Sequence, residues 1–227
     1  MSTPPARPRL GASALAVAGV LFALYPATRP WHDEATVDGA TRAMSSDWWV
    51  ASHLFAMIGF ILVTLGLLAV RDAVRHTRAE RLAFAAVVTG WIGVGLVLPY
   101  YGAEDFGLHA VAGKYAAGQP LDLLDLVDTV RYAPAAITTF GIGLIALAVS
   151  AIVTAVAIWR SGVLPRLSGI LFALGFALFL PQFYTPAAVR VAHGLLIAVG
   201  SVWLALALAL WSAGRTSPAG SRSGAAS

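Results

Sequence analysis

Long apolar segments separated by short polar segments dominate the sequence. Six of them approach the roughly 20 residues that a helix needs to cross about 30 Å of hydrocarbon. They cover about 10–26, 49–70, 82–101, 133–159, 167–183 and 187–211. Because lipid offers the backbone no hydrogen bonds, each segment must be helical. The pattern predicts an all-α, polytopic transmembrane helix bundle of about six spans.

The composition supports this prediction. Of the 227 residues, 59% are hydrophobic and 11% are charged, whereas soluble domains carry about a quarter charged residues. Because so few charges could not cover a water-soluble surface, we expect the lipid bilayer to surround the protein. The net charge of +4 does not indicate nucleic-acid binding, since the arginines flank apolar segments and form no stripe on a polar face. The chain has no cysteine, which excludes disulfides and thiolate chemistry.

The distribution of arginine and lysine predicts the orientation in the membrane. With a cytoplasmic N-terminus, most of the fifteen basic residues fall in inner segments, and most of the eleven acidic residues fall outside. Both termini are therefore expected in the cytoplasm, with 1–9 as an N-terminal segment and 212–227 as a disordered tail rich in serine, glycine and alanine.

The first apolar segment also resembles a signal peptide, because Arg7 and Arg9 precede it. The residues around its end, Leu24-Tyr25-Pro26-Ala27, lack the small residues that a cleavage site needs. We therefore expect an uncleaved first helix.

Prolines and glycines predict where helices end and where they approach each other. Pro26, Pro99 and Pro181 follow the first, third and fifth apolar segments among aromatic residues, which is typical of helix ends at the membrane interface. Diverged copies of one hairpin are an alternative interpretation of this similarity. The glycines of the third and fourth spans, Gly90, Gly93, Gly95, Gly141 and Gly143, predict close helix packing.

Two outer loops, 28–48 and 102–132, are long enough to carry structure. In the second loop Asp122, Asp125 and Asp128 are three residues apart with leucines between them. This period predicts a short amphipathic helix in the membrane interface.

Ionisable residues gather on the outer side. His53 and His193 lie inside apolar segments, and such residues are costly in lipid and usually face the bundle interior. Arg190 precedes His193 by three residues, so both lie on one helical face. The candidate polar cluster comprises His53, Glu104, Asp105, His109, Arg190 and His193.

Three interpretations of this cluster stay open. In the first, neutral His53 and His193 bond to backbone carbonyls, to hydroxyls or to each other, and Arg190 pairs with Glu104 or Asp105. These links would close the outer ends of the helices. In the second, His53, His109, His193 and Glu104 bind zinc with one position left for water, as in an outward-facing, metal-dependent hydrolase.

The third interpretation is a small transporter in which histidine protonation acts as a switch. The inner halves of the helices offer it only hydroxyls, such as Thr64 and Ser150. Haem ligation by His53 and His193 would place both residues at a similar depth, but no other haem feature accompanies them.

Four short stretches resemble those of uncharacterised bacterial multi-pass membrane proteins. They are Ser52-His53-Leu54, Tyr101 to Phe106, Gly162 to Arg166, and Val191-Ala192-His193-Gly194. The resemblance implies a bacterial plasma-membrane protein and transfers neither an activity nor site residues. From the sequence we expect a structural, accessory or sensing membrane protein, and protein partners and oligomeric state stay open.

Overall fold

A computed structural model describes residues 6–215, and helices are the only regular elements in that part of the chain. Their order is α1 (Ala6–Thr28), α2 (Val37–Met44), α3 (Asp47–Val74), α4 (Glu80–Gly102), the π-helical turn η1 (Ala103–Gly107), α5 (Leu108–Ala116), α6 (Leu123–Tyr132), α7 (Pro134–Ser161), the 3-10 turn η2 (Arg166–Gly169), α8 (Ile170–Ala177), the 3-10 turn η3 (Pro181–Tyr184) and α9 (Ala187–Gly214). The predicted all-α class is confirmed.

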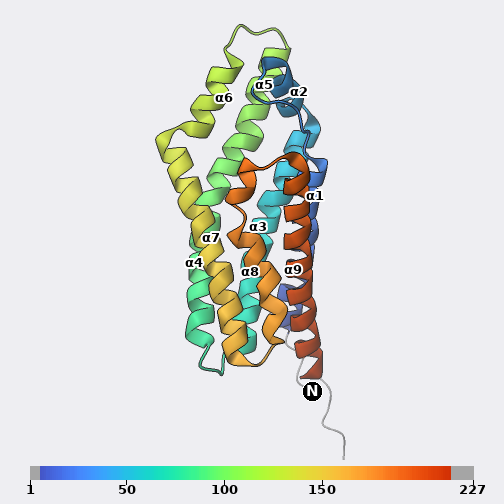
Figure 1. The fold of residues 1–227 in the computed structure, drawn as a ribbon, viewed down its shortest axis with the longest axis vertical. Helices are drawn as coiled ribbons and strands as arrows, with labels where there is room; N and C mark the ends of the chain where they lie inside the picture. Colours follow the sequence, from blue (N-terminus) through green and yellow to red (C-terminus); the bar gives the residue numbers. More distant parts are fainter. Residues whose placement is uncertain (1–5, 216–227) are drawn as a thin grey trace, which may run out of the picture.

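Five long helices and the short helix α8 form a closed ring around an apolar core. Neighbours in the ring are α1 and α3, α3 and α4, α4 and α7, α7 and α8, α8 and α9, and finally α9 and α1. In Figure 1 the bundle is elongated, α2, α5 and α6 lie at one end, and both described ends of the chain lie near the other. We call α2, α5 and α6 the cap, and its side of the molecule the cap end.

Five helical segments are long and apolar enough to cross a membrane. They begin or end close to the predicted boundaries, except that the third continues through η1 and α5 to Ala116. The predicted span 167–183 is wrong as a single long helix, because it consists of η2, the short helix α8 and η3. This broken segment occupies the sixth position of the ring between α7 and α9.

Two of the helix ends predicted at prolines are also wrong. α1 continues through Pro26 to Thr28, and α4 continues through Pro99 to Gly102. Proline removes the hydrogen bond to the carbonyl four residues earlier and crowds it. For Pro26 that carbonyl belongs to Phe22, and both lie against Gly194 of α9, where an added Cβ would be 2.6 Å from each. The missing side chain of Gly194 leaves room for the proline inside α1.

Aromatic rings and small residues fill the middle of the bundle. Phe22, Phe60, Phe176 and Phe179 are buried and contact one another mostly edge to face, an arrangement that aromatic rings favour. The predicted glycine packing holds at Gly93 and Gly143, where a Cβ on either would lie about 3 Å from the other's carbonyl oxygen. Gly95 and Gly141 have no such neighbour.

The cap has its own apolar cluster. Leu108 and Ala112 of α5 pack with Met44 of α2, Trp49 of α3 and Leu123 of α6. Side-chain caps begin two of these short helices, since Thr36 accepts from Gly39 N and Asp122 accepts from Asp125 N. The predicted helix with spaced aspartates is therefore confirmed, and Leu123 and Val127 of its apolar face are buried in this cluster.

The end of the chain differs slightly from expectation. α9 extends through Gly214, so the predicted disordered tail does not begin at Ser212. The remainder of that tail, 216–227, and residues 1–5 of the predicted N-terminal segment lie outside the described residues.

Candidate functional site

Four charged side chains form a continuous chain of ion pairs where the cap meets the bundle. Arg29 follows α1 and contacts Glu34 at 2.7 Å, and Glu34 contacts Arg131 of α6 at 2.8 Å. Arg131 then binds both carboxylate oxygens of Glu104 in η1, at 2.6 and 2.9 Å. We call Arg29, Glu34, Arg131 and Glu104 the charge chain. It connects three segments that are far apart in sequence, and its side chains are largely buried.

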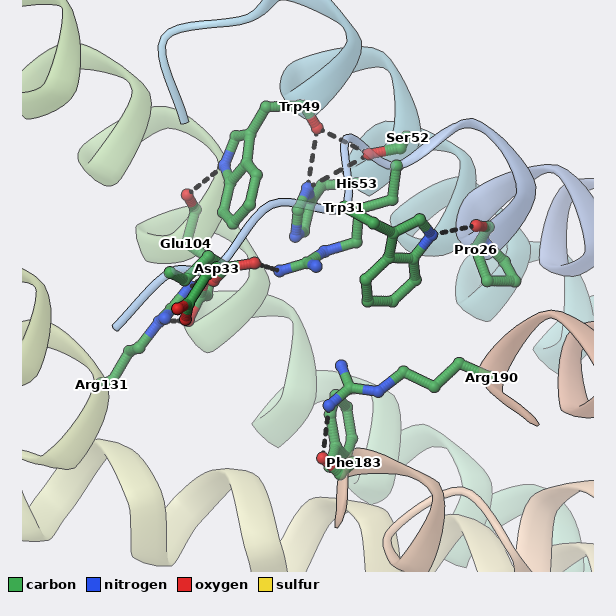
Figure 2. A network of polar contacts seen from close by, with 12 residues as sticks. Pro26, Trp31, Asp33, Trp49, Ser52, His53, Glu104, Arg131, Phe183 and Arg190 are labelled. Atoms are coloured by element: carbon green, nitrogen blue, oxygen red, sulfur yellow. Dashed lines mark hydrogen bonds and ion pairs between the residues drawn. The ribbon is translucent and has the colours of Figure 1, made fainter. Parts of the chain in front are cut away.

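Indole rings enclose this charge chain. The guanidinium of Arg29 lies 4.5 Å from the ring centre of Trp31 and 4.7 Å from that of Trp49, close enough for cation–π attraction to both rings. Trp49 also donates from Nε1 to the backbone carbonyl of Glu104 at 2.8 Å, as Figure 2 shows. Trp49 therefore contacts the charge chain through its ring face and through its N–H.

The ion pairs shift the pKa values of Glu34 and Arg131. Burial alone would raise the pKa of Glu34, but the guanidinium groups of Arg29 and Arg131 hold it below its ordinary value. Burial disfavours the charge of Arg131, yet Glu104 and Glu34 raise the pKa of its guanidinium. Glu34 and Arg131 are consequently charged at neutral pH.

The three predicted site histidines each bond to a backbone carbonyl. His53 uses Nδ1 toward Trp49 O, His109 uses Nδ1 toward Met44 O, and His193 uses Nε2 toward Gly175 O, each at 2.7 Å. A carbonyl oxygen only accepts, so the named ring nitrogen must be the donor in every case.

The hydrogen bond of His193 compensates for the end of the helical hydrogen-bond pattern after α8. In a continuous helix Phe179 N would donate to Gly175 O, but here it donates to Phe176 O at 3.2 Å. The carbonyl of Gly175 accepts from His193 Nε2 instead. This histidine thus satisfies a buried backbone group that the irregular segment leaves open.

His53 and His193 face the same aromatic core without contacting each other. His53 packs on Trp49 and Tyr25, whereas His193 packs on Phe179. Across residues 6–215, no three histidine or carboxylate side chains are gathered as metal ligands. The structure therefore does not bring together His53, His109, His193 and Glu104, the set that the zinc interpretation requires.

Arg190 does not pair with Glu104 or Asp105, so this predicted contact is wrong. Its guanidinium donates to the backbone carbonyls of Phe183 and Thr185 and lies over the rings of Trp31 and Phe183. Figure 2 shows the contact with Phe183. Glu104 pairs with Arg131 instead. The cavity beside Arg190 and His193 measures about 10 Å³, close to the minimum for one water molecule.

Asp105 is the exception among the predicted residues. Its side chain is fully buried, and neither carboxylate oxygen has a hydrogen-bond partner in the described part of the chain. His109, four residues later on the same helical face, acts on it electrostatically. The site thus contains one carboxyl group that the protein itself does not satisfy.

Sequence reasoning missed Arg29, Glu34 and Arg131. It favoured histidines because these lie inside apolar segments. The three missed residues lie in the predicted outer loops, and Arg29 and Arg131 are within three residues of a predicted span end. That position was the available signal, since charges next to a span end are brought close together when helices pack. It could not show which charges pair, because Glu34 and Arg131 are distant in sequence.

Comparison of the chain with protein-family models, with curated proteins and with solved structures finds no match. The site geometry is therefore the basis for a functional proposal.

Proposed function

We propose that this chain is a non-catalytic, multi-pass protein of the bacterial plasma membrane. The charge chain holds the cap as a fixed platform on the outer side, and both chain ends lie in the cytoplasm. The role that fits such a platform is accessory or sensing. Each long helix carries its charged residues near its ends, which supports membrane insertion.

One observation carries this proposal. Except for Asp105, the polar groups expected to do chemistry are held by the protein's own groups: the three histidines by carbonyls, and Glu104 by Arg131. A reaction centre needs groups left free to meet a substrate, whereas a structural joint needs groups that are mutually satisfied. No contact of the described residues specifically favours a metal-dependent hydrolase or a transporter.

Element analysis of purified protein tests this proposal. We expect no stoichiometric zinc in the natural chain, and a His53→Ala/His193→Ala variant that differs only by lower stability. Each substitution removes a donor to a buried carbonyl, which costs about 1–3 kcal/mol. Stoichiometric zinc that disappears in the double variant would overturn the proposal in favour of the hydrolase.

A further inference from the structure

A hollow of about 470 Å³ opens on the surface between α3 and the η1–α5 segment. Four of the residues that line it belong to α3 and follow the spacing of a single helical face, so one face of α3 forms a wall of the hollow. The lining residues are Asp47, Val50, Ala51, Leu54, Phe106 and His109. We call this hollow the α3–α5 groove.

The α3–α5 groove has a polar end and an apolar end. α3 runs away from the cap end, so Leu54 lies about 10 Å further from that end than Asp47, at 1.5 Å per residue. The opposing segment runs toward the cap end, so Phe106 lies further from it than His109. Both walls therefore place their polar residue at the cap end and an apolar residue nearer the middle of the bundle.

The polar end offers hydrogen-bond acceptors. Asp47 is exposed and has no ion pair among residues 6–215, and an ionised carboxylate only accepts. His109 uses Nδ1 as the donor to Met44 O, so the neutral form of this ring has Nε2 as an acceptor. A ligand that matches both groups needs several donors, and a positive charge suits Asp47.

Asp105 is a further carboxyl group on this side of the molecule. It shares a helical face with His109, and its buried side-chain oxygens have no partner in the described part of the chain. The arginines of the charge chain pair with its own glutamates and not with Asp47. The exposed carboxylate of Asp47 is therefore the group that favours a cation at the groove's polar end.

We infer that the α3–α5 groove binds a phospholipid with a primary-amine headgroup, such as phosphatidylethanolamine. The ammonium group lies at Asp47 and His109, and an acyl chain follows Val50, Leu54 and Phe106 toward the middle of the bundle. A primary ammonium has three donors and no acceptor, which complements the acceptors of the polar end. The inference rests on the proposed membrane insertion, because only a bilayer presents this amphiphile with its head at the cap end.

Three lipids with the same acyl chains separate the contribution of the headgroup's N–H donors from that of its positive charge. Phosphatidylethanolamine has N–H donors and a positive headgroup nitrogen, phosphatidylcholine keeps the positive nitrogen without N–H donors, and phosphatidylglycerol has no positive group. The groove chemistry predicts the strongest binding for the first lipid and the weakest for the last.

Lipid-depleted protein in detergent is titrated with mixed micelles of each lipid, and the melting temperature is recorded. We expect phosphatidylethanolamine to raise it most, and Asp47→Asn to raise the apparent Kd roughly tenfold, because a charge-assisted hydrogen bond is lost. Asp125→Asn is the matched control, since Asp125 is an exposed carboxylate of α6 outside the groove. Ala51→Trp should fill the groove and abolish the selective shift.

Equal shifts for the three lipids would overturn the inference, as would a phosphatidylethanolamine preference that survives in both groove variants. Asp47→Asn changes an exposed residue, so its result stands if Ala51→Trp does not fold. Zinc content and membrane orientation are unaffected by either outcome, so failure of the lipid site is distinguishable from failure of the proposed function.

Discussion

At the scale of single residues, the charge chain shows why burial decides the value of an ion pair. Arg131 and Glu104 are largely shielded from water, and two parallel hydrogen bonds join them. Arg42 and Asp38 of α2 also pair, but both are mostly exposed. Removing one partner of a buried pair leaves an uncompensated charge, whereas an exposed charge is stabilised by water.

Replacement of Glu104 by glutamine tests this difference. The variant keeps the shape of the side chain but leaves Arg131 with Glu34 alone, so we expect a loss of about 2–3 kcal/mol in the free energy of unfolding. The matched control is Asp38→Asn, which should cost under about 0.5 kcal/mol. Chemical unfolding in detergent measures both, and equal losses would contradict a stabilising role for the charge chain.

Glu34 predicts how stability depends on pH. Its pKa is lowered on folding, because the attraction of Arg29 and Arg131 exceeds the effect of burial. The resulting stabilisation is fully present above the unfolded value near 4.5 and is lost as pH falls through the lower folded pKa. A series of melting temperatures between pH 6 and pH 3 should show a shallower decline for Glu34→Gln. Parallel curves for the two proteins would refute this assignment.

At the scale of elements, apolar length predicted the helices well but not their interruptions. The spans 49–70, 133–159 and 187–211 correspond to α3, α7 and α9 because apolar runs of that length have one stable backbone arrangement in lipid. The break in α8 depends on a donor from another helix, His193 of α9. No local sequence pattern near Gly175 indicates such a donor, so the interruption of the helix after α8 could not be predicted.

Helix packing gives the third prediction. Gly93 faces the backbone of Gly143 so closely that a Cβ on Gly93 would lie 2.9 Å from its carbonyl oxygen, whereas Gly95 has open space. Gly93→Ala should therefore separate α4 from α7 and cost about 1–3 kcal/mol. Gly95→Ala should stabilise α4 by up to about 1 kcal/mol, because alanine favours helix. Thermal unfolding of both variants measures the contrast, and a neutral Gly93→Ala would contradict the packing.

At the scale of the whole molecule, the sequence predicted which end is polar but not how that end is assembled. His53, His109 and His193 do lie toward the cap end. Their partners are backbone carbonyls, which a sequence does not identify. The pairing of Arg131 with Glu34 and Glu104 follows from the position of α6 over η1, a contact that only the folded chain creates.

The absence of cysteine from the natural sequence permits a direct test of membrane orientation. Gln119, in the cap, and His76, between α3 and α4, are both exposed, so each can be replaced by a single cysteine. Intact cells are then treated with a membrane-impermeant maleimide. The account predicts that Gln119→Cys is labelled in intact cells and His76→Cys only after permeabilisation. Labelling of both in intact cells, or the reverse pattern, would contradict a cap held outside above helices that span the membrane.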